Sequence, residues 1–429
     1  MKKLYFFILI LLTSFFCLPN NAESKNKETY ELLDLFGQIF DRVRSSYVEE
    51  VTDEKLIEKA IDGMLTGLDP HSGYMNEEVW QEMQMDTKGK FGGLGIEITM
   101  EEGFVKVISP IEDTPAYRAG VEAGDYIIQI DETPVFGLTL TEAVELMRGK
   151  IGTSITITVS REGVEPFQIN IVRDYIKIQS VKEDLFENIG YLRITSFTEQ
   201  TEKGLIKSIR EIQNDLDNKE TGYVLDLRSN PGGLLSQAVK VTDIFLERGE
   251  IVSTRGREKN DITRYKAKRD DYIKGKPLVV IINGGSASAS EIVAGALQDH
   301  RRAIIIGTQS FGKGSVQTII PFQKSNSEKI TGIRLTTARY YTPSGVSIQG
   351  KGIAPDILVE QGKFESFNYQ NLSESDLKDS LDKNENIDGS TNNNDKNISE
   401  KEEKLKKDFQ LQRALDLVKG LSLYKEYLK

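Results

Sequence analysis

A run of small polar residues, 284–291, lies where an apolar strand is expected to turn into a helix. Enzymes with α/β folds expose a serine hydroxyl at such turns, and the amides at the helix start can stabilise an oxyanion. Ser288 in this run is a candidate nucleophile. Serines at helix starts more often act only as caps, so the run alone favours a structural role.

A serine nucleophile needs a base, and the chain has only two histidines. His300 lies at the far end of the expected helix, roughly 18 Å from Ser288 at 1.5 Å per residue, and cannot reach it. His71 follows Pro70 at a helix end, where capping or packing is favoured. Lys313 follows the next expected strand, which a right-handed crossover returns beside the first. A lysine is therefore the candidate base.

Lys313 can accept a proton only as a neutral amine, which requires burial to depress its pKa from about 10.4. The glycines on both sides of Lys313 allow close packing around it. Gln317 could hold the amine in line through its amide without adding charge. The ordinary alternative is a lysine exposed on the surface.

A competing motif overlaps this segment. Residues 307–313, GTQSFGK, fit the pattern G-x-x-x-x-G-K of a phosphate-binding loop. Gly314 stands where that loop needs Ser or Thr, and residues 315–321 have the pattern of a strand, so a phosphate would lack its helix N-terminus. Nucleotide hydrolysis is the least favoured alternative.

Composition bounds the function classes. The chain has 429 residues, 38% of them hydrophobic, enough for two to four folded units. Its net charge of -11 and pI near 5.1 argue against nucleic-acid binding. The only cysteine is Cys17, so a chain that begins after residue 22 has no disulfide, cysteine nucleophile or cysteine metal ligand.

Residues 1–22 have the pattern of a secretory signal. Lys2 and Lys3 precede an apolar run over 4–16, and a cleavage site fits at Ala22. The run is shorter than the ~20 residues of a spanning helix. We expect an exported protein of the periplasm or cell envelope; an uncleaved segment would instead hold it at a membrane.

The next part of the chain predicts two modules. Apolar residues recur at helical intervals from about residue 28 to 68, and another amphipathic stretch surrounds Trp80. From residue 89, short β-type runs at 92–98, 104–108, 126–131 and 154–160 alternate with glycines. We therefore expect a helical N-terminal module over 23–88 and a small β domain over 89–173.

The β segment resembles a PDZ domain. The resemblance rests on the runs GLGI (Gly93, Leu94, Gly95 and Ile96), AGVEAGD (119–125) and MRGKIGT (147–153). A PDZ domain adds a peptide to a sheet edge and holds its terminal carboxylate on backbone amides of a glycine-rich loop. The resemblance implies that residues 93–96 are this loop; a glycine-rich turn that only packs the domain is the alternative.

After residue 174, buried strands alternate with helices, which predicts an α/β core. Strands are expected at 222–227, 278–282, 302–307, 315–322 and 333–341, and helices at 234–247 and 289–299. Residues 363–402 have the composition of a disordered linker. Helical spacing returns over 403–429, so a terminal helix should pack on the body or on a second copy.

Three runs resemble the core motifs of the C-terminal processing (tail-specific) serine protease family. They are DLRSNPGG (226–233), SASASE (286–291) and FGKGSVQ (311–317), and the likeness spans about residues 28–362. It implies Ser288 as the nucleophile, Lys313 as the general base and Gln317 as the residue that orients the lysine.

The same resemblance implies an oxyanion hole made by the backbone amides of Ala289 and Gly233, with glycine needed at the second position for close approach. Arg148 and Glu291 are treated as structural.

The sequence thus predicts a multi-domain α/β serine endopeptidase. A protease core over 174–362 carries an inserted or preceding PDZ-like β-barrel domain and a helical N-terminal module. It uses no cofactor and no metal, and its partners are the C-termini of proteins or peptides, with the terminal helices as contacts of a homo-oligomer. The alternative is a PDZ-containing scaffold with an inactive protease-like body.

Overall fold

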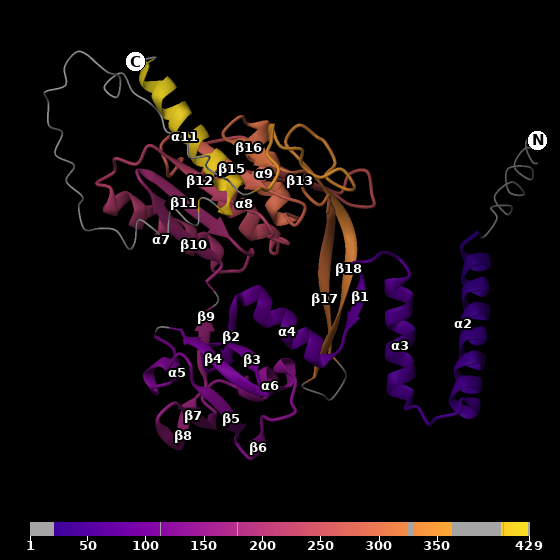
Figure 1. The fold of residues 1–429 in the computed structure, drawn as a ribbon. Coiled ribbons are helices and arrows are strands. Elements are labelled where there is room, and N and C mark those ends of the chain that lie inside the picture. The colour runs from indigo at the N-terminus through magenta and orange to yellow at the C-terminus, as the bar shows by residue number, and fades with distance from the viewer. Residues whose placement is uncertain are drawn as a thin grey trace, which may run out of the picture. The chain divides into compact units, whose positions relative to one another are not determined.

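The computed structural model describes residues 21–111, 113–177, 179–323, 329–362, 405 and 407–427 (Figure 1). The predicted signal segment, apart from its last two residues, and the predicted linker over 363–402 lie outside the described residues. The chain divides into two compact units. Of the described residues, those up to 76 and those within 319–335 form one, and those within 77–318 and after 335 form the other.

The first unit contains helices α2 (Asn21–Ser46) and α3 (Asp53–Thr66) and strand β1 (Gly73–Met75). Thr52 caps α3, since its hydroxyl accepts a hydrogen bond from the Lys55 N–H at 3.3 Å. Strand β1 pairs antiparallel with β18 (Ile330–Tyr341), so the far end of the β17 (Ser315–Gln323) and β18 hairpin belongs to this unit. The helical lead-in is therefore interrupted by a short strand.

The β domain follows α4 (Glu77–Lys88) in the second unit. Its strands are β3 (Ile96–Glu101), β4 (Phe104–Pro110), β5 (Tyr126–Ile130), β6 (Thr133–Pro134), β7 (Ser154–Arg161) and β8 (Val164–Val172), and its helices are α5 (Pro115–Arg118) and α6 (Leu140–Met147). The sheet order is β3-β4-β5-β7-β8, with β6 on β5. Strands β2 (Lys90–Gly93) and β9 (Asp174–Lys177) pair at the domain's two ends. Strand β3 is thus an edge strand.

A six-stranded sheet organises the α/β core. Its order is β10 (Val181–Phe186), β11 (Ile189–Ile194), β12 (Gly222–Asp226), β15 (Leu278–Ile282), β16 (Ile304–Gly307) and β19 (Ile357–Leu358). All neighbours pair in parallel except β10 and β11. Every residue of β12 and β15 is buried, which explains their continuous apolar runs.

Helices cover both faces of this sheet (Figure 1). Helices α7 (Thr201–Asp215), α8 (Leu235–Asp243) and α9 (Ala289–Asp299) share one hydrophobic core with alternate strand residues. Helix α11 (Phe409–Tyr427) packs Leu411, Ala414 and Val418 against the other face. Strands β13 (Glu250–Arg255) and β14 (Ile262–Lys266) pair with each other, and β13 also pairs with the end of β18. The terminal helix therefore packs on the body of its own chain.

Candidate active site

The nucleophile turn connects β15 to α9. Ser288 immediately precedes α9 and has a φ of 54°, in the left-handed region that side chains other than glycine rarely adopt. It is 7% exposed. Ala289 starts the helix, so its N–H has no intrahelical acceptor and is free to face a ligand. The structure therefore places Ser288 and a helix N-terminal amide at one turn, as the sequence predicts, and shows in addition that the serine backbone is strained.

The lysine loop follows the neighbouring strand. Strands β15 and β16 run parallel with Ile282 opposite Gly307, so the segments that leave both strands start at the same sheet edge. Lys313 is half-buried and lies between Gly312 and Gly314. A Cβ at Gly314 would clash with the backbone of Gln349, so close packing here requires glycine. The prediction that this strand returns parallel beside the first is confirmed.

Glu291 joins these two segments. Its side chain is fully buried. One carboxylate oxygen accepts the backbone N–H of Ser288 at 2.7 Å and that of Lys313 at 2.9 Å. The other accepts the Gly312 N–H and the Ser310 hydroxyl, both at 2.6 Å. A single carboxylate thus fixes the backbone of the candidate nucleophile against that of the candidate base. The sequence predicts only a structural role for Glu291 and does not indicate this tertiary contact.

The loop over 227–233 lies against the nucleophile turn. A Cβ on Gly232 would come within 2.8 Å of both the Ala287 carbonyl oxygen and the Ser288 Cβ. Gly232 and Gly233 have φ values of 105° and 139°, so the backbone conformation favours glycine at both positions. Phe197 forms a parallel bridge with this loop: its N–H donates to the Gly232 carbonyl, and its carbonyl accepts the N–H of Leu234. The Gly233 N–H takes no part in this bridge. Glycine here provides the close approach that an oxyanion donor needs.

Gln317 lies on β17 beyond the lysine loop. Its amide nitrogen donates to the hydroxyl of Ser315 at 2.9 Å and to that of Thr336 at 3.3 Å. The side chain is half-buried. These hydroxyls fix the amide from two sides, and the role of Gln317 toward Lys313 stays a prediction. Because β17 is a strand, the phosphate-binding loop has no helix after its lysine, and this alternative is wrong.

Tyr340 is a site residue that sequence reasoning missed. It is 5% exposed on β18, its N–H donates to the Gly314 carbonyl at 2.7 Å, and its phenol lies near the Ser288 side chain. Burial raises the pKa of Tyr340 to about 12, so the phenol is neutral throughout the physiological range. Tyr340 lies at the end of a predicted strand, and nothing in the local sequence indicates that it lies near Ser288.

The predicted carboxylate loop of the β domain runs into edge strand β3. Gly95 has a φ of 81°, and a Cβ there would clash with the side chain of Thr114. The Thr114 hydroxyl and the Ile111 N–H both donate to the Gly95 carbonyl. Leu94 is 3% exposed and packs in the domain core. The loop is therefore rigid and ends at an unpaired sheet edge, the geometry that β-augmentation requires.

The remaining candidates lie apart from this chemistry. His300 ends α9, and its Nε2 lies 2.7 Å from the Glu250 carbonyl oxygen. The Arg148 guanidinium lies over the Phe91 ring, 5.0 Å from its centroid. Within the residues that the structure describes, no group of three or more His, Cys, Asp or Glu side chains could hold a metal ion.

Comparison with known protein families defines the class as a serine-type peptidase. The model of Peptidase family S41 matches residues 188–359, a PDZ domain model matches 106–161, and the "Activating protease CtpB N-terminal domain" matches 17–79. The S41 match includes all three motifs around Ser288, Lys313 and Gly233.

The chain belongs to the carboxy-terminal-processing protease family. It is 56% identical over 385 residues to the carboxy-terminal-processing protease of Bartonella bacilliformis, covering 88% of this chain and 87% of that protein. It is 34% identical over 338 residues to the carboxy-terminal processing protease CtpA of Bacillus subtilis, covering 78% and 71%. The photosystem II D1 C-terminal processing protease structure is 29% identical and covers 74% of this chain and 85% of its own, with a TM-score of 0.44. The predicted family, fold class and enzyme class are confirmed.

Proposed function

We propose that this peptidase cleaves proteins near their C-termini with a Ser288 and Lys313 dyad. The neutral Lys313 amine takes the Ser288 proton as the hydroxyl oxygen attacks the scissile carbonyl, and the resulting ammonium protonates the leaving amine. A water that loses its proton to Lys313 then attacks the acyl carbonyl, and Lys313 returns that proton to the Ser288 oxygen as the acyl bond breaks. The amides of Ala289 and Gly233 hold the oxyanion in both steps.

One observation carries this proposal: Glu291 binds the backbone of Ser288 and of Lys313 through the same carboxylate oxygen. Holding a nucleophile and a base in one geometry removes most of the entropic cost of bringing them together. Gln317, anchored by two hydroxyls, completes the proposed site as the residue that orients the lysine.

The test is cleavage of an unfolded, cysteine-free protein by residues 23–429 and by the variants Ser288→Ala and Lys313→Ala. We expect both variants to lose activity by at least about 10³-fold, and wild-type activity to rise with pH as a lysine becomes neutral. Equal activity in all three proteins would contradict the dyad.

We propose that the PDZ domain recognises substrate C-termini through residues 93–96 and edge strand β3. The unpaired edge and the rigid Gly95 turn support this assignment. A binding scaffold with an inert body would bind C-terminal peptides and never cleave them. Peptide binding by Ser288→Ala, measured beside cleavage by the wild type, separates the two functions.

Export and self-association complete the proposal. The pattern of residues 1–22 supports export to the periplasm or cell envelope, and no helix among the described residues is long and apolar enough to cross a membrane.

Helix α2 exposes the apolar side chains of Leu32, Leu33 and Phe36. In the same unit, α3 and the β17 and β18 hairpin line a largely apolar cavity of about 620 Å³. These surfaces support a homo-oligomer through the N-terminal helices, which sedimentation velocity tests directly.

A further inference from the structure

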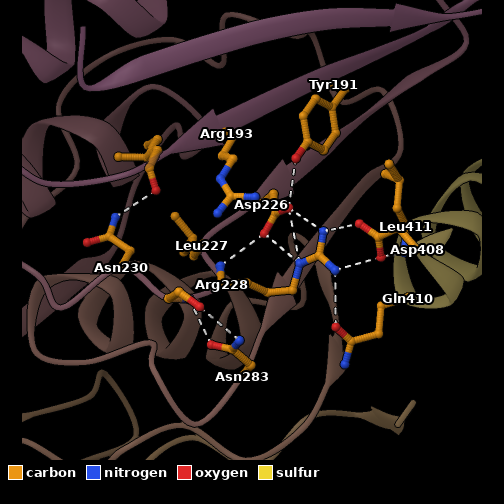
Figure 2. Close-up of polar contacts among 12 residues, drawn as sticks. Tyr191, Arg193, Asp226, Leu227, Arg228, Asn230, Asn283, Asp408, Gln410 and Leu411 are labelled. Atoms are coloured by element: carbon orange, nitrogen blue, oxygen red, sulfur yellow. Dashed lines mark hydrogen bonds and ion pairs between the residues drawn. The ribbon is translucent and has the colours of Figure 1, made fainter. Parts of the chain in front are cut away.

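A buried ion pair anchors the start of the loop over 227–233 (Figure 2). Asp226 is fully buried and Arg228 is 7% exposed. The Arg228 Nη2 lies 2.6 Å from Asp226 Oδ2, and its Nε lies 3.0 Å from Oδ1. The Arg228 backbone N–H also donates to Oδ1, at 2.9 Å. The last residue of β12 thereby fixes both the backbone and the side chain of Arg228.

The same guanidinium reaches the N-terminus of α11 (Figure 2). Its Nη1 and Nη2 each donate to one oxygen of Asp408 at 2.7 Å, and Nη1 also donates to the Gln410 side chain at 3.2 Å. Asp408 immediately precedes α11 and caps it, since Oδ1 accepts the Leu411 N–H at 3.1 Å. Arg228 therefore bridges two segments that are 180 residues apart in the sequence.

Arg228 and Asp408 hold each other in their charged forms. Burial opposes the charge of Arg228, but hydrogen bonds from Arg228 to Asp408 and Asp226 hold its pKa above the ordinary value. Burial likewise opposes the charge of Asp408, and Arg228 more than offsets it, so the pKa of Asp408 is lowered. Removal of one partner would leave a buried charge without compensation, which moves the groups that hold it.

The other end of the loop is fastened to the nucleophile turn. Asn230 is fully buried, and its carbonyl accepts the Ala287 N–H and the Ser290 hydroxyl, both at 3.0 Å. Its side chain accepts the Gly232 N–H at 2.9 Å. The loop thus runs from Arg228 directly into the residues beside Gly233, and four residues separate these two positions. Arg228 and Gly233 are therefore joined by a short segment that hydrogen bonds hold at Asn230 and Gly232.

We infer that Asp408 and Arg228 are positioning residues, through which the C-terminal helix holds the Gly233 amide in the geometry that acyl transfer needs. This inference rests on the proposed function, because that function assigns the Gly233 amide to the oxyanion. Helix α11 then does more than cover one face of the sheet: it completes the active-site loop.

The test compares Asp408→Asn with the matched control Asp416→Asn. Asparagine caps a helix as well as aspartate does, so the first variant removes the charge and keeps the cap. Asp416 lies on the same helix and pairs with Arg413 at 2.9 Å, with both side chains about half exposed. The measurements are kcat and KM on a fluorogenic peptide and the Ki of a peptide aldehyde, whose serine adduct carries an oxyanion.

We expect Asp408→Asn to lower kcat by about 10- to 100-fold with KM nearly unchanged, and to weaken the aldehyde by a similar factor. Asp416→Asn should match the wild type. A kcat per folded molecule that equals the wild-type value, with only the melting temperature lowered, would overturn the inference.

Hydrogen exchange separates this inference from the proposed function, because it needs no cleavage. Amides in the segment 229–234 should exchange faster in Asp408→Asn than in the wild type and in Asp416→Asn. Equal exchange in all three overturns the inference. If Ser288→Ala cleaves as fast as the wild type, the proposed dyad fails, and the exchange data still decide whether α11 holds the loop.

Discussion

Helix α6 of the PDZ domain and helix α9 of the peptidase core both begin with a hydroxyl residue at the N-cap and a glutamate three positions later. In α6, Glu142 is exposed and its carboxylate accepts hydrogen bonds from the backbone and the hydroxyl of Thr139. In α9, Glu291 is fully buried and accepts four hydrogen bonds, three of them from residues 310–313. The same local motif caps one helix and, where it is buried, also joins the Ser288 turn to the Lys313 loop.

Glycines in the two regions differ in the same way. Gly120 in the PDZ domain has a φ of 84°, and a Cβ there would meet nothing within 4 Å. Gly232 in the core has a φ of 105° and lies directly against the Ser288 turn. In the first case glycine serves only the backbone, whereas in the second it also provides space for a neighbouring segment.

The replacement Glu291→Gln should have the largest effect. One carboxylate oxygen becomes an NH₂ group that faces two donors, which costs on the order of 2–6 kcal/mol of folding free energy. Both the Ser288 turn and the Lys313 loop then move, and we expect kcat/KM to fall about 10³-fold. Kinetic assays below the melting temperature, with circular dichroism as the measure of folded protein, check this result.

The matched control is Glu142→Gln, which leaves an exposed cap that water can complete. Hydrogen bonds from the Thr139 backbone and side chain lower the pKa of Glu142, so its contribution to stability is present at neutral pH and is lost as the pH falls through the folded pKa. We expect wild-type kcat/KM in this control. A similar loss in both variants would mean that Glu291 is only a helix cap.

The difference between these two helices marks what could be predicted from the sequence. Strand β15 and helix α9 have the predicted limits, because an apolar run and a glycine-rich turn are local signals. Helix α7 was not among the predicted elements, although Leu205, Ile209 and Ile212 have helical spacing. Strands β13 and β14 were also missed, since β14 is largely exposed and has few apolar residues.

The candidate site could be predicted where it follows from motifs, and not where it depends on distant contacts. Ser288 and Lys313 stand out because of the turn and the glycines around them. Glu291 joins the Ser288 turn to the Lys313 loop through hydrogen bonds to a loop about 20 residues later in the sequence. Arg228 bridges to the carboxylate of Asp408, 180 residues away. No local pattern encodes either contact.

The variant Gly232→Ala should have an intermediate effect. Its methyl group would lie against the Ser288 Cβ and the Ala287 carbonyl, which displaces the loop that carries the Gly233 amide. The loss of one oxyanion donor lowers kcat by about 10²-fold. Gly120→Ala is the control, because Gly120 also has a positive φ but a Cβ there would meet nothing within 4 Å. We expect it to lower the melting temperature and to leave kcat unchanged; a full kcat in Gly232→Ala would sink the assignment of this loop to the oxyanion hole.

The smallest effect is expected for Tyr340→Phe, with Tyr126→Phe in the PDZ domain as its control. Loss of the buried hydroxyl near Ser288, a polar contact worth about 1 kcal/mol, should lower kcat about five-fold without changing the pH profile below pH 10. The exposed hydroxyl of Tyr126 donates to Glu101 at 2.8 Å, and its removal should leave kcat as it is.

Alkaline unfolding gives Tyr340 a second and independent signature. Because burial raises its pKa to about 12 from an ordinary 10, the unfolded chain releases this proton before the folded protein does. The wild type should therefore lose stability between about pH 10 and pH 12, by an amount on the order of 2–3 kcal/mol that Tyr340→Phe does not lose. Denaturant titrations of both proteins at both pH values measure the difference. An equal loss of stability in the wild type and in Tyr340→Phe would show that the Tyr340 hydroxyl reaches water. The contrast between the two regions would then rest on Glu291 and Gly232 alone.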